Sequence, residues 1–152
     1  MKFKKFSLTA LLLSLCAIIL HSLAIAETNN PPIKVMSFNI RNGSAKDGDN
    51  SWSHRHQLLI ETIRIFDPDL LGLQEVQKFQ ADYLREQLPG YDFYGVGLND
   101  GIDKGEFAPV MFKRDRFEMV DSGHFWLSET PKVIGSRSWD SALPRIATWA
   151  LL

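Results

Sequence analysis

The sequence predicts an α/β (α+β) fold in which strands and helices alternate along one chain. Residues 33–40 (IKVMSFNI) alternate apolar and polar side chains, as a half-buried strand does. Residues 52–66 carry apolar side chains at helical spacing, and residues 70–73 form a short, wholly apolar strand. A right-handed crossover through the helix then places the two strands together in one sheet.

The first strand and the first helix each have a predicted buried face. In the strand, we expect Val35 and the other apolar side chains to point into the core. In the helix, Ser53 is a suitable N-cap. The buried stripe of that helix is expected to contain Leu58, Leu59, Ile63 and Phe66. The segment 67–69 (DPD) then ends the helix.

The rest of the chain is expected to continue this alternation. A second helix spans residues 76–88 and stops at Pro89-Gly90. Three strand candidates follow at 91–96, 107–112 and 117–125, and an irregular loop covers 126–144. The last strand, 146–152 (IATWALL), indicates a sheet that expects further partners, although a domain can also end on a strand.

Residues 1–26 have the pattern of a secretory signal peptide. Three lysines and no acid precede an apolar run, which ends at the small residues of Ala24-Ile25-Ala26. We expect cleavage after Ala26 and a secreted or periplasmic protein without a stable membrane anchor. An uncleaved anchor is the alternative, but the apolar run is shorter than the roughly 20 residues that a membrane span needs. Cys16 is the chain's only cysteine, so the exported protein would contain no disulfide.

Polar side chains follow the first two predicted strands. In open α/β sheets the carboxyl ends of the strands line the functional crevice. Asn39 lies near the end of the first strand, and Gln74 and Glu75 end the second. A carboxylate is a hard oxygen ligand suited to Mg²⁺ or Mn²⁺, and an amide can support it without adding charge. A solvated glutamate at the start of the next helix is the alternative interpretation of Glu75.

An ordered set of motifs resembles the endonuclease/exonuclease/phosphatase superfamily, which has the DNase I-like fold. The matching segments are SFNI at 37–40, LQEV at 73–76, GEFA at 105–108, FWLSE at 125–129, SWD at 138–140 and PR at 144–145. The resemblance implies a layered β-sandwich of two sheets flanked by helices. It also implies a metal-dependent hydrolase of phosphoester bonds. On this resemblance, residues 33–152 are the N-terminal part of such a domain.

The resemblance gives four residues a role. Glu75 matches the glutamate that binds Mg²⁺ (or Mn²⁺), and Asn39 matches the asparagine that supports the metal and the phosphate. Glu106 resembles the acid that orients a catalytic histidine, with an exposed turn acid as the alternative. Arg145 resembles an arginine that reaches the scissile phosphate, where its planar fork fits pairs of oxygens. A surface residue of a strand is the alternative for Arg145.

The family motifs that supply the general base do not occur in this sequence. Neither an Asn-Thr-His, a Gly-Asp-x-Asn nor a Ser-Asp-His segment is present. We therefore expect an exported phosphoester hydrolase present as a truncated chain that is essentially inactive alone and poorly stable. In such a chain, we expect much of the apolar surface of Val110, Phe112, Phe117 and Trp149 to be exposed to solvent. A non-catalytic remnant and an unrelated exported α/β binding module are the alternatives.

The substrate and several other residues stay open at this stage. The phosphoester could be a nucleic acid, a phospholipid, a sugar phosphate or a nucleotide, and no specific protein partner is predicted. A metal site at His54 and His56 is disfavoured because alternate residues of a helix point in different directions. His124 is expected to be a surface or hydrogen-bonded histidine. The tryptophans at 126, 139 and 149 could stack on a ligand, but packing is the favoured interpretation.

Overall fold

The computed structural model describes residues 31–152, so the predicted signal peptide and its cleavage site lie outside the described residues. The described part contains six strands and two α-helices. In chain order these are β1 (Val35–Asn39), α2 (Trp52–Phe66), β2 (Leu70–Gln74), α3 (Lys78–Gln87), β3 (Tyr91–Tyr94), β4 (Val110–Lys113), β5 (Asp121–Trp126) and β6 (Ile146–Leu151). No helix within residues 31–152 is long and apolar enough to span a bilayer.

Four of these strands form a mixed sheet in the order β1-β2-β4-β3. The predicted crossover is confirmed, because β1 and β2 are parallel and in one sheet. Strand β4 is antiparallel to both β2 and β3. The register places Asn39 opposite Gln74, so β1 and β2 end side by side. This alignment brings Asn39 next to the residue that follows β2, Glu75.

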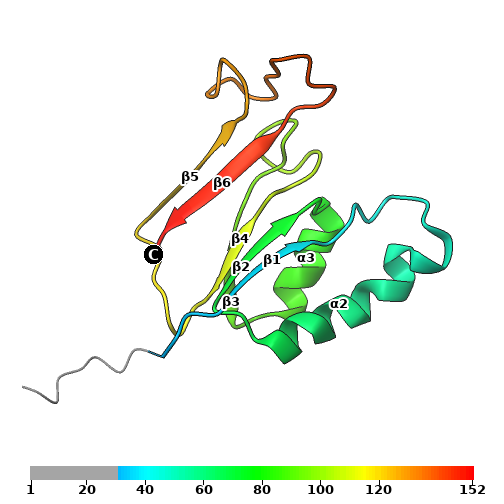
Figure 1. Ribbon diagram of the computed structural model, residues 1–152, viewed down its shortest axis with the longest axis vertical. Coiled ribbons are helices and arrows are strands. Elements are labelled where there is room, and N and C mark those ends of the chain that lie inside the picture. Colours follow the sequence, from blue (N-terminus) through cyan, green and yellow to red (C-terminus); the bar gives the residue numbers. More distant parts are fainter. Residues whose placement is uncertain (1–30) are drawn as a thin grey trace, which may run out of the picture. The chain divides into compact units, whose positions relative to one another are not determined.

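Both helices pack on one face of this sheet, on the side away from β5 and β6 (Figure 1). The core between helices and sheet includes Leu59, Ile60 and Ile63 from α2 together with Leu71 and Leu73 from β2. The predicted stripe of α2 is partly wrong, because Leu58 and Phe66 are exposed and Ile60 is buried instead. The N-cap of α2 is Ser51 rather than Ser53.

The predicted inward face of β1 is wrong for Val35 but right for the other apolar side chains of the strand. Val35 is 63% exposed, whereas Met36 and Phe38 pack against the core. Because successive side chains of a strand point to opposite faces, a core contact at Met36 turns Val35 away from the helices.

Strands β5 and β6 form a separate two-stranded antiparallel sheet. It is tied to the segment after β3, because Trp126 Nε1 donates to the Leu98 carbonyl oxygen (2.7 Å). Phe112 lies on the opposite face of β4 from Met111 but is only 1% exposed. The expected exposure to solvent is therefore wrong for this side chain. Trp149 is 42% exposed, and Val110 and Phe117 are partly buried.

Several predicted boundaries shift, and the strand predicted at 91–96 ends at Tyr94. Helix α3 begins at Lys78 rather than residue 76, because the backbone of Val76 pairs with Phe107 and Gln77 is the N-cap. The strand predicted at 107–112 is confined to Val110–Lys113. The strand predicted at 117–125 begins only at Asp121, because Phe117 N–H bonds to the Lys113 carbonyl oxygen in a turn.

Candidate metal and phosphate site

The predicted pair of Asn39 and Glu75 is in direct contact at the carboxyl ends of β1 and β2. Asn39 Nδ2 donates to Glu75 Oε1 at 2.9 Å. Glu75 has a left-handed backbone (φ 61°), which ends the strand and turns the side chain toward β1. Left-handed backbone at a non-glycine residue is uncommon and gathers at functional sites. Glu75 therefore does not open the next helix, which begins at Lys78.

A third polar residue, Asn42, joins the two acids of the site. Its backbone N–H donates to Glu75 Oε2 (2.9 Å), and its side-chain Nδ2 donates to Glu106 Oε1 (2.8 Å). Asn42 thus sets the separation between a carboxylate that follows β2 and one that precedes β4. Asn42 belongs to none of the family motifs in this sequence, so the sequence alone did not predict its place in the site.

The buried amide of Gln80 in α3 holds the loop that carries Asn42. Gln80 is fully buried; its Oε1 accepts from the N–H groups of Gly43 and Gln77 (both 2.9 Å), and its Nε2 donates to the Arg41 carbonyl (3.1 Å). Gly43 is required because a Cβ there would lie 2.6 Å from the Gln80 side chain. Both hydrogen bonds to Oε1 and the one from Nε2 join Gln80 to the backbone, so Gln80 positions the loop.

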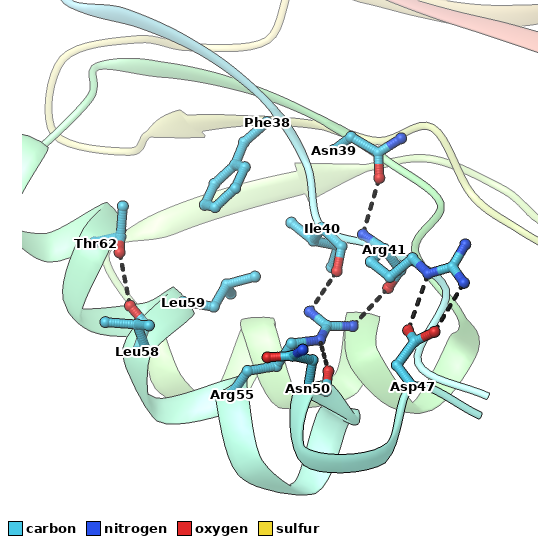
Figure 2. Close-up of a pocket in the computed structure, with 10 residues that line it drawn as sticks. All are labelled: Phe38, Asn39, Ile40, Arg41, Asp47, Asn50, Arg55, Leu58, Leu59 and Thr62. Carbon is cyan, nitrogen blue, oxygen red and sulfur yellow. Dashed lines mark hydrogen bonds and ion pairs between the residues drawn. The ribbon is translucent and has the colours of Figure 1, made fainter. Parts of the chain in front are cut away.

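Arg55 of α2 holds the same loop from the other side, as Figure 2 shows. Its guanidinium donates to the carbonyl oxygens of Ile40 (2.6 Å) and Arg41 (3.0 Å), and its Nε donates to that of Asn50 (3.0 Å). Arg41 is itself paired with Asp47 at 2.9 Å. The loop after β1 is therefore fixed by charged and amide groups rather than by apolar packing.

These contacts border a cavity of about 300 Å³ between β1, the loop and α2 (Figure 2). Phe38, Leu58 and Leu59 give it an apolar lining, which accounts for the exposure of Leu58. Asn39 and Arg41 line its end nearest the carboxylates.

All four residues predicted for the site line one cavity of about 200 Å³. Asn39 and Glu75 contribute from the ends of β1 and β2, Glu106 from the segment before β4, and Arg145 from the residue before β6. An adjoining cavity of about 380 Å³ is lined by Glu75, Glu106 and Arg145 and adds Arg41 and Asn42. Residues up to 106 positions apart in the sequence therefore converge on one polar recess, as the motifs predicted.

The electrostatics of the recess keep Glu75 ionised. The hydrogen bond from Asn39 is the main reason that the pKa of Glu75 lies below its usual 4.5, and the Asn42 N–H adds to it. The positive charges of Arg41 and Arg145 lower this pKa further. Neutral amide groups thus contribute most to the lowered pKa, and within residues 31–152 no cation forms an ion pair with this carboxylate.

The donor set fits a hard divalent cation. Each oxygen of Glu75 accepts one N–H, and an ionised carboxylate offers about four lone-pair sites, so both oxygens keep acceptor capacity for a metal. Within residues 31–152 there is no group of three histidine, cysteine or acidic side chains that could hold a metal alone. One or two carboxylates, waters and substrate phosphate oxygens are what Mg²⁺ commonly uses.

The other sequence candidates lie outside this recess. The Nδ1 atoms of His54 and His56 lie beside the backbone carbonyls of Asp49 and Trp52 (3.2 and 3.1 Å). His124 Nδ1 bonds to the Tyr94 hydroxyl (3.1 Å), which confirms the hydrogen-bonded alternative.

The tryptophans differ in their surroundings. Trp126 is buried, as packing predicted, whereas Trp139 is 69% exposed in the loop before β6.

Known proteins share this fold and much of this sequence. The model of the Endonuclease/Exonuclease/phosphatase family matches residues 36–145. A solved endonuclease/exonuclease/phosphatase from Bacteroides vulgatus is 41% identical with a TM-score of 0.75, over 78% of this chain and 45% of that one. A mannosyl-6-phosphatase from Bacteroides thetaiotaomicron is 40% identical with a TM-score of 0.74, again over 78% of this chain and 45% of that one.

A more distant curated relative is the CCR4-Not complex 3'-5'-exoribonuclease subunit Ccr4 from Emericella nidulans. It is 28% identical over 63% of this chain and 17% of its own length. The chain thus spans less than half the length of each of these relatives. The predicted DNase I-like fold class is confirmed by the solved structures, with mixed sheets and two helices in the described part. With its family model matched over most of its length, the chain belongs to the endonuclease/exonuclease/phosphatase family of hydrolases, whose enzymes generally depend on a divalent metal ion.

Proposed function

We propose that this chain supplies the metal-binding and phosphate-orienting part of an exported hydrolase of phosphate esters that uses Mg²⁺ or Mn²⁺. The convergence of Asn39, Glu75, Glu106 and Arg145 on one cavity is the observation that carries the proposal. A carboxylate kept ionised by amides, beside an arginine, is suited to a cation and a phosphate at the same time.

Each residue has a distinct part in the proposed reaction. Glu75 would hold the metal, which when bound neutralises charge that develops on the phosphoryl oxygens. Asn39 fixes the direction of the Glu75 carboxylate through its 2.9 Å hydrogen bond. Arg145 would bind two phosphoryl oxygens and hold the ester in line for attack. Glu106, held by Asn42, presents an acceptor for the N–H or O–H of the group that activates water.

The water-activating group itself is not provided by the described histidines. His54 and His56 belong to α2 and His124 to β5, and none of them lines the recess. General base catalysis contributes about 10²- to 10⁴-fold to the rate, so we expect this chain alone to turn over slower by that factor than a family member with the base.

For the substrate, we propose a sugar phosphate monoester. The mannosyl-6-phosphatase is matched at 40% identity over most of this chain, well above the 28% of the exoribonuclease subunit. The formal net charge of −1 offers no long-range attraction for a nucleic acid backbone.

The activity is tested by phosphate release from a hexose 6-phosphate and a nucleoside monophosphate, and by nucleotide release from a single-stranded RNA. The proposal expects slow release that is fastest from the hexose ester, stops with EDTA and is lost in Glu75→Gln. Glu61→Gln, an exposed acid of α2, is the matched control and should keep the wild-type rate. Release that persists in EDTA or in Glu75→Gln would contradict the proposed role of the metal.

Export is part of the proposal and is tested separately. The N-terminal pattern of lysines, apolar run and small residues supports cleavage after Ala26. Mass spectrometry of the protein recovered from the periplasm or the medium should find Glu27 as its first residue. A cell-retained product that begins at Met1 would rule this out.

A further inference from the structure

The loop between β5 and β6 contains a tight turn whose central residues do not suit its backbone. Ser141 N–H donates to the Ser138 carbonyl (3.1 Å), and the two residues between them, Trp139 and Asp140, have φ values of 56° and 58°. Two successive positive φ angles are the feature of a type I′ turn, which favours Asn-Gly or Gly-Gly. A bulky aromatic residue in this conformation is an outlier.

Neighbouring groups hold the turn in place despite this mismatch. The Ser138 hydroxyl accepts the Glu129 N–H (2.9 Å), and Arg137 Nη1 donates to the Ala142 carbonyl (2.8 Å). Strained backbone persists only where its surroundings enforce it, and it gathers at ligand-binding sites. Departures from local sequence preference are likewise expected at functional positions. The turn therefore presents Trp139 at the cost of a less stable backbone.

A cavity of about 500 Å³ opens at this turn, lined by residues 137–141. The 69% exposed ring of Trp139 offers a flat apolar face. Asp140 offers an acceptor, Arg137 a donor, and the two serines offer hydroxyls. This mixture suits a ring that carries hydroxyl groups, which has an apolar face and a polar rim. The negative charge of Asp140 also disfavours a second phosphate group, which a nucleic acid would bring to this position.

The same loop leads directly into the carboxylate recess. Leu143 and Arg145 line the cavity that contains Asn42, Glu75 and Glu106. Leu143 is four positions after Trp139, so their Cα atoms are at most about 14 Å apart. In Figure 1 this loop joins the end of β5 to the start of β6, the strand that begins directly after Arg145.

We propose that the Trp139–Asp140 turn is the subsite that binds the sugar ring of the substrate. Trp139 stacks on the ring, while Asp140 and Arg137 bind its hydroxyl groups and Arg145 holds the phosphate. This assignment rests on the proposed function and adds to it the residues that select the alcohol part of the ester.

The test measures binding rather than turnover, with phosphonate analogues that cannot be hydrolysed. Calorimetry with Mg²⁺ compares a hexose 6-phosphonate, a nucleoside phosphonate and methylphosphonate on the full chain. Trp139→Gly removes the ring. Glycine adopts a positive φ without strain, so the melting temperature of this variant should equal or exceed that of the wild type. Trp139→Phe keeps an aromatic face, and Phe66→Ala removes an exposed aromatic side chain at the end of α2.

The inference expects the hexose analogue to bind the wild type more tightly than methylphosphonate. Trp139→Gly should weaken the hexose analogue about tenfold, a typical worth of one aromatic contact, and leave methylphosphonate unchanged. Trp139→Phe should restore most of the affinity, and Phe66→Ala should have no effect. Equal binding of hexose analogue and methylphosphonate would overturn the subsite alone, and so would a larger loss for the nucleoside analogue. If the wild type bound none of the three, the proposed function would fail as well.

Discussion

Strand β2 has a carboxylate at each end, and the two are held in opposite ways. Asp69, directly before the strand, is 2% exposed and pairs with Lys113 (3.2 Å) and Arg116 (2.5 Å). Glu75, directly after it, is half-buried and accepts only amide N–H groups, from Asn39 and Asn42. A neutral N–H is the largest cause of the depressed pKa of both acids, from Lys34 at Asp69 and from Asn39 at Glu75. They differ because Asp69 also accepts hydrogen bonds from the cations Arg116 and Lys113, whereas the hydrogen bonds that lower the pKa of Glu75 come from neutral groups.

The comparison separates a structural carboxylate from one that can bind a ligand. The N–H of Lys34 and the two cations lower the pKa of Asp69 to about 2 and leave its charge compensated inside the protein. A buried acid without such partners would be strongly unfavourable. Glu75 keeps its charge and its remaining lone pairs facing a cavity. A carboxylate with a low pKa is therefore not by itself a metal ligand. A low pKa in a carboxylate that no cation neutralises does indicate one.

The largest expected effect is the loss of metal binding in Glu75→Gln. This substitution replaces the carboxylate that Asn39 contacts with a neutral amide. The affinity for Mn²⁺ should therefore fall by more than the 10- to 100-fold that is typical when a residue that orients a metal ligand is changed. The melting temperature without metal should change little, because Glu75 is at the rim. Calorimetric Mn²⁺ titration and a thermal melt measure the two effects, with Glu61→Gln as the control.

Asp69→Asn should give the reverse result. Loss of the charge leaves Lys113 and Arg116 facing a neutral side chain near the start of β2, so the protein should be destabilised by more than the ~0.5 kcal/mol of a surface substitution. Affinity for Mn²⁺ should not change. Urea unfolding of both variants measures this, and equal stability of Asp69→Asn and Glu61→Gln would contradict the structural role of Asp69.

Asn42→Ala should have a smaller effect on metal binding than Glu75→Gln. The variant keeps the backbone N–H to Glu75 but loses the side-chain bond to Glu106, so the two acids are no longer linked. Metal affinity or activity should fall about 10-fold, the lower end of the range for residues that position ligands. Gln57→Ala, an exposed amide of α2, is the control, and an equal response in both variants would remove Asn42 from the site.

The smallest expected effect concerns pH. Since Asn39 is the main cause of the lowered pKa of Glu75, Asn39→Ala should move that pKa back toward 4.5. In the wild type, the contribution of ionised Glu75 to stability is complete above pH 4.5 and is lost as the pH falls through the lower native value. Carboxyl-carbon NMR of the two proteins measures this shift, and identical titration curves would show that the hydrogen bond has no electrostatic role.

The sequence predicts the ends of β1 and β2 well because general rules apply there. Alternation and the crossover rule place the two strands in one parallel pair, and the carboxyl-end rule then brings Asn39 to Glu75. Glu106 and Arg145 could not be placed in this way, because their approach depends on long connections. Their motifs alone predicted a shared site, and the structure does bring them to one cavity.

Other features depend on packing that one sequence does not encode locally. Asn42 bonds to Glu106, which lies 64 residues away, so no local pattern indicates its role. In α2, both Leu58 and Ile60 are apolar, and only the docking direction of the helix decides which of them is buried. The burial of Asp69 likewise follows from Lys113 and Arg116, which come from the distant segment around β4.

We expect a divalent metal to bind at Glu75 and not at Asp69, although one strand joins them. Paramagnetic broadening of backbone amide signals by sub-stoichiometric Mn²⁺ tests it most directly. Asp69 and Glu75 are about 20 Å apart along an extended strand, so the two ends give separate signals. The account predicts that the amides of Asn39, Asn42 and Glu75 broaden first, that those around Asp69 and Lys113 stay sharp, and that Glu75→Gln abolishes the effect. Broadening centred on Asp69, or broadening at the recess that survives in Glu75→Gln, would contradict it.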